Sequence, residues 1–127
     1  MQIRSAKDLI VYQKAYALAM DIFDASKKFP AEEKYSLTDQ IRRSSRSVCA
    51  NLREAWAKRR YEAHFVSKLT DADCENGETE TWLDFAYDCK YVSKGDHVIF
   101  TEKCRQVGAM LRSMINDPSS FIVRFDL

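Results

Sequence analysis

Residues 36–58 read SLTDQIRRSSRSVCANLREAWAK, and this stretch decides the fold class. Its apolar and small residues recur at steps of three and four, which places them on one face of a helix. These positions are Leu37, Ile41, Ser44, Val48, Leu52 and Ala55. Ser36, followed three residues later by Asp39, is a capping signal. The stretch therefore predicts an amphipathic helix over residues 36–58.

Three further segments carry the same helical period, and they span residues 8–28, 61–92 and 96–116. Short breaks lie between the segments and after the last one, at Phe29-Pro30, Ser93-Lys94-Gly95 and Asp117-Pro118. Four long helices with short links predict an all-α fold, an antiparallel up-down four-helix bundle forming a single domain over residues 1–127. The apolar tail, residues 118–127, is expected to dock on the bundle or on a neighbouring subunit. Gly77 inside the third segment is interpreted as a tolerated glycine at which another backbone can come close.

The composition supports this interpretation and excludes several classes of protein. Only 3 Gly and 2 Pro in 127 residues leave few turns, so the elements must be long. Twenty Lys and Arg against 19 Asp and Glu argue against a uniform polycation that coats nucleic acid or anionic membrane. The sequence contains neither a secretory signal nor an apolar run of membrane-spanning length. We expect a cytoplasmic protein without a membrane partner.

The sequence offers little support for catalysis or metal binding. The four cysteines, Cys49, Cys74, Cys89 and Cys104, form no CxxC pair, so reduced, buried thiols are expected. His64 and His97 are isolated, which leaves zinc as a weak alternative. There is neither a Glu-x-x-His motif nor a glycine-rich phosphate loop. We expect a non-enzymatic protein with no catalytic residue, metal ligand, cofactor or small-molecule substrate.

Charge is segregated along the chain. Residues 42–60 contain seven basic side chains and one acid, whereas residues 71–88 contain seven acids and no basic side chain. At 100° per residue, Arg42, Arg46, Arg53 and Arg60 share one line along the second helix. Guanidinium groups bind phosphates in a bidentate manner, and an indole offers a stacking face for a base. The candidate nucleic-acid-binding residues, for RNA or DNA, are Arg42, Arg43, Arg46, Arg53, Arg60 and Trp56.

A second interpretation pairs these arginines with carboxylates. Asp71, Glu75 and Glu78 lie on one side of the third helix and could meet the arginine line within the chain or across subunits. The protein would then be a protein–protein scaffold with internally paired arginines and no nucleic-acid partner. Both interpretations stay open at the level of sequence, and they can coexist.

The third helix also carries a second apolar strip, formed by Trp82, Phe85, Cys89 and Val92. One bundle seam cannot bury this strip together with the main stripe of the helix. It either covers the fourth helix or the tail, or it forms a subunit interface in a closed homo-oligomer. The oligomer-interface candidates are Trp82, Phe85, Cys89, Val92, Asp71, Glu75 and Glu78.

Two runs of sequence resemble a known family. Phe29-Pro30 followed by residues 34–55, KYSLTDQIRRSSRSVCANLREA, resembles the bacterial four-helix-bundle family encoded in intervening sequences of large-subunit ribosomal RNA genes. Residues 78–92, ETETWLDFAYDCKYV, are similar to a subgroup of that family. Arg42 and Arg43 match its arginine pair, and Asn51 and Glu54 match its Asn and Glu. Three glycines typical of the family are replaced, by Ser36, Ala55 and Lys90.

The resemblance implies a helical bundle that assembles into a homopentameric ring. It also implies a distant relationship to accessory proteins of diversity-generating retroelements, which bind nucleic acid and a reverse transcriptase. The loss of the three glycines is expected to alter turns and helix approach more than binding.

Overall fold

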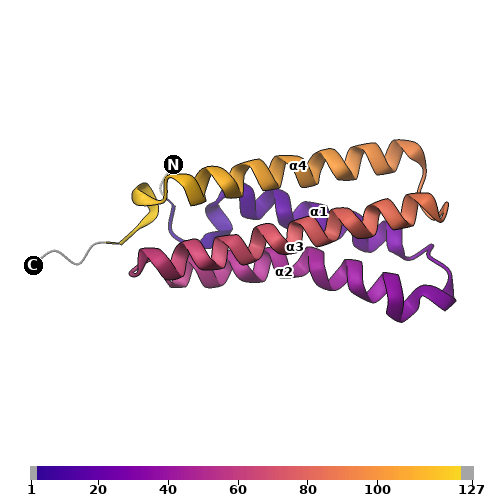
Figure 1. Ribbon diagram of the computed structural model, residues 1–127, viewed down its shortest axis with the longest axis horizontal. Coiled ribbons are helices and arrows are strands. Elements are labelled where there is room, and N and C mark those ends of the chain that lie inside the picture. The colour runs from indigo at the N-terminus through magenta and orange to yellow at the C-terminus, as the bar shows by residue number, and fades with distance from the viewer. Residues whose placement is uncertain (1–2, 124–127) are drawn as a thin grey trace, which may run out of the picture.

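The computed structural model describes residues 3–123, which form four long helices and no strand. The helices are α1 (Ile10–Ser26), α2 (Asp39–Ala57), α3 (Glu62–Asp88) and α4 (Lys94–Asn116). They lie side by side along the long axis of the molecule, and the chain reverses direction at each connection (Figure 1). The expectation of an all-α fold with four long helices is confirmed.

The start of the second helical segment differs from the expectation. Residues Lys34–Thr38 form a π-helical turn that runs directly into α2. Ser36 does not cap α2, because its hydroxyl donates to the Glu33 carboxylate at 2.6 Å. The Tyr91 hydroxyl donates to the same carboxylate at 2.9 Å, which ties the α1–α2 connection to the turn after α3.

The third helix ends at Asp88 rather than Val92. Lys90 has a φ of 68°, a left-handed conformation that stops the helix. The Tyr91 amide donates to the Ala86 carbonyl at 2.8 Å, and the Lys90 amide donates to Tyr87 at 2.9 Å. These two bonds form a Schellman motif with lysine at the position that usually holds glycine.

The tail docks on the bundle as far as the structure describes it. The Phe121 ring lies 6.1 Å from the Phe65 ring, and the Val123 amide donates to the Arg59 carbonyl at 3.1 Å. The remaining part of the predicted docked tail, residues 124–127, lies outside the described residues.

The core consists of two apolar clusters. The cluster at the end near both termini contains Leu9, Val11, Ala15, Val48, Cys49, Leu52, Ala55, Phe65, Leu69, Ala72, Val107, Leu111 and Met114. The cluster toward the opposite end contains Leu18, Ile22, Ile41, Leu83, Phe100 and Cys104. Burying these side chains supplies the main driving force for folding.

Buried polar side chains lie between the two clusters along α2 and α3. The Ser44 and Thr79 hydroxyls are 2.8 Å apart, which joins α2 to α3. The Asn76 amide donates to the Cys104 carbonyl at 2.8 Å, which joins α3 to α4. We call Ser44, Asn76 and Thr79 the polar layer. A buried polar group is tolerated only with a partner, so these contacts favour one axial register of the three helices.

Replacing the lysine in the left-handed turn is expected to stabilise the protein. Lys90→Gly removes the steric penalty of a Cβ at positive φ, partly offset by the greater freedom of glycine in the unfolded chain. We expect about 0.5–1 kcal/mol more unfolding free energy, measured by urea denaturation followed by circular dichroism. Lys14→Gly, in the helical backbone of α1, should lower stability by about 1 kcal/mol. Equal effects at both positions would contradict this account.

Removing the amide of the polar layer is expected to destabilise the protein. Asn76→Ala deletes the donor to the Cys104 carbonyl and leaves a small buried gap. We expect a loss of about 1–3 kcal/mol in thermal or urea unfolding. Asn116→Ala, an exposed asparagine at the end of α4, should change stability by less than about 0.5 kcal/mol.

Candidate nucleic-acid interface

Arg42 is used inside the bundle. Its Nε donates to the Ser26 hydroxyl at 2.7 Å, and its Nη2 lies 3.5 Å from the Phe23 carbonyl. The guanidinium lies 4.6 Å from the centre of the Phe23 ring, a cation–π distance. Arg42 therefore fastens α2 to the end of α1, with two of its three guanidinium nitrogens directed at groups of α1.

Arg43 pairs with the carboxylates of α3. Its guanidinium lies 3.2 Å from Glu75 and also contacts Glu78. Partial burial raises the pKa of the Glu75 carboxyl, while the charge of Arg43 acts in the opposite direction. Asp71, the third predicted acid, lies 3.7 Å from Lys68 instead. For Arg43, pairing with the predicted acids thus takes place within one chain.

Arg46 and Arg53 are two of the exposed members of the arginine line. Neither has a carboxylate within 4.0 Å among residues 3–123. The Arg46 guanidinium lies 5.5 Å from the centre of the Phe23 ring, while Arg53 projects from α2 one turn before its end. These two side chains keep their charge available for a partner outside the chain.

Basic and aromatic side chains surround a hollow of about 620 Å³ at the α2–α3 turn. The lining residues are Trp56, Ala57, Lys58, Arg59, Arg60, Tyr61, His64 and Val123. No acidic side chain is among these described lining residues. We call this the basic hollow. It is positively charged, aromatic and concave, a combination suited to a nucleotide phosphate and base.

Trp56 was predicted to offer its indole face for stacking a nucleobase, but Arg59 covers that ring in the structure. The Arg59 guanidinium lies over the indole at 3.6 Å, and its Nε donates to the Trp56 carbonyl at 2.8 Å. Partial burial lowers the pKa of Arg59. Tyr61 and His64 instead form an exposed edge-to-face pair, with ring centres 5.6 Å apart.

Sequence reasoning selected Arg60 and Trp56 but left out the other lining residues of the basic hollow. The run Lys58-Arg59-Arg60-Tyr61 was the available sequence signal for this hollow, since it combines three basic residues and an aromatic residue at a helix end. Val123 carried no such signal, because only the folded chain brings it to the turn. His64 lies in the first turn of α3, next to the run, but was interpreted as an isolated histidine.

The predicted interface strip on α3 is partly covered by the chain itself. Trp82 packs against the second core cluster, and its ring lies 6.0 Å from that of Phe85. A hollow of about 220 Å³ separates these rings from Glu33, Ser36 and Leu37. The segment before α2 therefore lies beside the strip.

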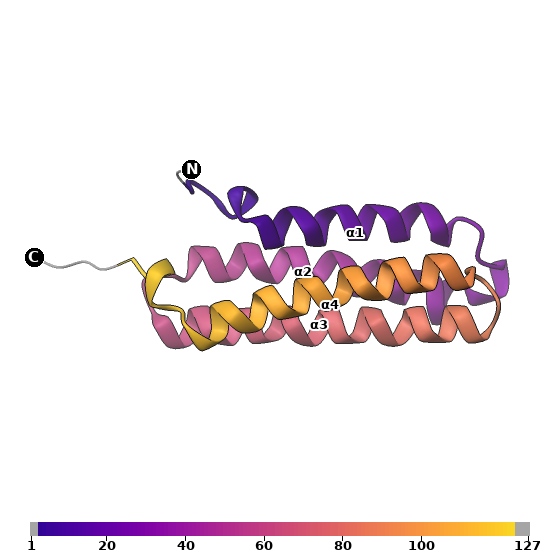
Figure 2. The ribbon, with the colours of Figure 1, turned by 90° about the horizontal axis from the view of Figure 1, so that it is seen from above.

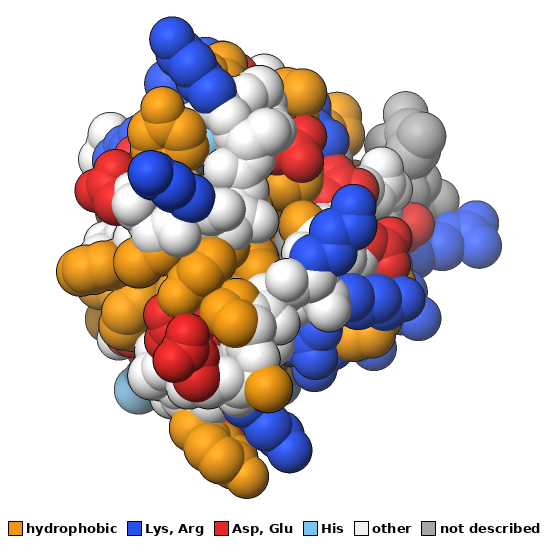
Figure 3. Space-filling model, turned by 90° about the vertical axis from the view of Figure 1, so that its right-hand side faces the viewer, with side chains coloured by type: hydrophobic (Ala, Val, Ile, Leu, Met, Phe, Trp, Pro, Cys, Tyr) orange, Lys and Arg blue, Asp and Glu red, His pale blue; other side chains and the backbone are white. Residues whose placement is uncertain are grey.

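Phe85 and Cys89 are exposed, whereas Val92 is half-buried. These residues lie toward the end of the molecule formed by the α1–α2 and α3–α4 connections. Figure 3 views this end and shows hydrophobic side chains on one part of it and a group of Lys and Arg on its right-hand side. The strip thus offers a smaller apolar surface than its sequence pattern predicted.

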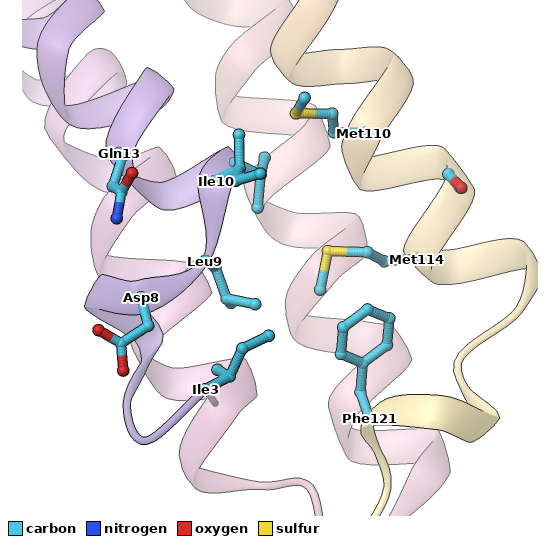
Figure 4. Close-up of a pocket in the computed structure, with 10 residues that line it drawn as sticks. Ile3, Asp8, Leu9, Ile10, Gln13, Met110, Met114 and Phe121 are labelled. Atoms are coloured by element: carbon cyan, nitrogen blue, oxygen red, sulfur yellow. The ribbon is translucent and has the colours of Figure 1, made fainter. Parts of the chain in front are cut away.

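An apolar hollow of about 500 Å³ lies between the start of α1 and the end of α4. Leu9, Met114 and Phe121 point into it (Figure 4). The nearby Asp8 carboxylate accepts the backbone amides of Arg4 and Ser5, which lowers the Asp8 pKa. This carboxylate therefore serves the local turn.

Residues 3–123 contain no group of three or more side chains placed to hold a metal ion. No helix in the described part of the chain has the length and apolar character needed to cross a membrane.

Comparison with known proteins identifies the family. The family model for the 23S rRNA-intervening sequence protein matches residues 7–113. The chain belongs to this family. One solved structure that it resembles is a protein of unknown function from the S23 ribosomal protein family of Bacteroides thetaiotaomicron. The two share 30% sequence identity over 84% of this chain and 96% of that one, with a TM-score of 0.76. None of the curated proteins compared with this chain matches it.

The thiols of this family member divide into two classes, which corrects the expectation that all four are buried. Cys49 and Cys104 are buried, and burial raises their pKa values to about 11 and about 12. Cys74 and Cys89 are exposed on α3 and after its end.

Cys49 and Cys104 are expected to resist a thiol-specific maleimide at pH 8, because little of either thiol is ionised and neither is accessible. Mass spectrometry of tryptic peptides should show modification at Cys74 and Cys89 first and at the two buried cysteines only after urea unfolding. Rapid labelling of Cys104 in the folded protein would contradict the buried position.

Proposed function

We propose that this member of the 23S rRNA-intervening sequence protein family is a non-enzymatic, RNA-associated protein of the cytoplasm. Its bundle is an up-down antiparallel unit that assembles into a homopentameric ring. The RNA contact is made by Arg53 of α2 together with the basic hollow. The observation that carries this proposal is the absence of an acidic side chain from the described lining of that hollow.

Single-stranded RNA fits the basic hollow better than a duplex. Its volume of about 620 Å³ is concave, and the exposed rings of Tyr61 and His64 offer an edge on which a splayed base can stack. A duplex keeps its bases stacked internally and presents mainly phosphates and sugar hydroxyls. The proposed ligand is therefore a loop or an unpaired end.

Arg42 and Arg43 favour a second candidate function. Because both are engaged within the chain, the part of α2 that precedes Arg46 is a structural element rather than a phosphate ligand. A protein–protein scaffold that uses all its arginines in this way would bind no nucleic acid. The distinction depends on Arg53 and the basic hollow.

Fluorescence anisotropy with a labelled single-stranded RNA tests the proposal across a salt series. Phosphate contacts predict a linear fall of log affinity with log salt concentration, with a slope of about −0.7 for each phosphate neutralised. Arg53→Ala should weaken binding and reduce that slope by about 0.7 to 1. Tyr61→Ala should weaken binding by about 1–3 kcal/mol and leave the slope unchanged, because it removes stacking and no charge.

Arg105→Ala is the matched control. Arg105 is an exposed arginine of α4 that is already paired with Glu102 at 2.6 Å, so its loss should leave RNA affinity unchanged. Failure of the wild-type protein to bind RNA at low salt would support the scaffold instead. An equal loss of affinity for Arg53→Ala and Arg105→Ala would indicate nonspecific attraction.

A further inference from the structure

The outer face of α1 carries three large apolar side chains even though it is turned away from the bundle. Ile10 is 62% exposed, Tyr16 55% and Met20 46%. The Tyr16 ring stacks with that of Tyr12 at 6.2 Å and separates two hollows of about 370 and 240 Å³. In Figure 2, α1 lies along one edge of the molecule. We call Ile10, Tyr16 and Met20 the α1 face; large apolar side chains exposed on one side of a helix mark a candidate interaction site.

Two of the three charged side chains of α1 are paired with opposite charges within the chain, Asp21 with Lys103 and Asp24 with Lys27. Lys14 keeps its charge, because its partner is the neutral side chain of Gln106. A second positive charge comes from α2, where Arg46 lines the same hollow as Tyr16 and Met20. The surface thus combines Tyr, Met and Arg, residue types enriched at protein–protein interfaces.

The outer side of α3 has the complementary character. Its exposed line consists of small side chains, at Ala63, Ser67, Thr70, Cys74, Gly77 and Thr81. A Cβ at Gly77 would meet nothing within 4 Å, so the space beside this position is open and the expectation that another backbone comes close there is wrong. Glu80 and Asp88 are exposed on the same helix and have no basic partner among residues 3–123. We call this line with its two acids the α3 face.

We propose that the α1 face of one copy packs against the α3 face of a second copy. The large apolar side chains of the α1 face then pack against the small side chains of the α3 face. Arg46 of one copy pairs with Glu80 or Asp88 of the other. This inference rests on the proposed homo-oligomer and names the surfaces that build it. Because the two faces differ, the contact is heterologous, and each copy can offer one face to each of two neighbours, as a ring requires.

The available area is sufficient for a specific contact. The 17 residues of α1 extend over about 25 Å, and α1 with the flank of α2 is roughly 20 Å wide. This surface amounts to about 500 Å² per partner, or about 1,000 Å² in total, at the lower limit for specific interfaces. The charge pairs at its edge favour one orientation over the others.

Sedimentation velocity on two complementary variants tests the proposal. Tyr16→Glu disables the α1 face, and Gly77→Arg disables the α3 face at a position with open space around it. Each variant alone should show a dissociation constant raised by at least about 30-fold, as for loss of an interface hot spot. An equimolar mixture should form a heterodimer of one copy each, because each variant supplies the face that the other lacks.

Tyr35→Glu is the control, since Tyr35 is 73% exposed and lies on neither face. It should assemble like the wild type, and thermal unfolding should show that all three variants are folded. Assembly of Tyr16→Glu or Gly77→Arg at wild-type concentrations would overturn the two faces while leaving the proposed oligomer intact. A mixture that stays monomeric would overturn the heterologous contact. A monomeric wild type would overturn both the inference and the proposed oligomer. If Tyr16→Glu still assembles but no longer binds RNA, the α1 face is an RNA-binding surface instead of a subunit contact.

Discussion

The polar layer is the constraint on which the arrangement of α2, α3 and α4 depends. Apolar surfaces attract without direction, so the two core clusters alone would tolerate helices shifted along one another. The Ser44–Thr79 contact and the Asn76 bond to the Cys104 carbonyl are satisfied in one register only. That register sets which carboxylates of α3 stand opposite Arg43, and therefore which arginines of α2 are left for other partners.

Periodicity predicted most of the fold because it depends on local sequence. The steps of three and four fixed the helices and nearly all of their buried faces. Helix ends were harder, since Lys90 adopts a conformation that its own side chain disfavours. Tyr91 beside it is held by Glu33, more than fifty residues away, so no local signal marks that end.

The candidate site was predicted less completely for a related reason. Helical spacing places the Cα atoms of the arginine line, but a long side chain can turn toward either neighbouring helix. Arg42 turns toward Ser26 and Arg43 toward Glu75, 16 and 32 residues away in sequence. The direction of each arginine side chain is therefore set by tertiary contacts and not by the local sequence. Arg53 has no such partner in the described part of the chain, and the family match leaves its role to binding measurements.

The docked tail has a practical consequence for anyone handling the protein. The Val123 amide donates to the Arg59 carbonyl at the basic hollow, and Ile3 lines the apolar hollow that Phe121, two residues before Val123, also lines. A purification tag or reporter fused at either of these positions would therefore crowd the surface proposed for RNA. Attachment at the α3–α4 connection, near Gly95, places the fusion about one bundle length away and leaves that surface unobstructed.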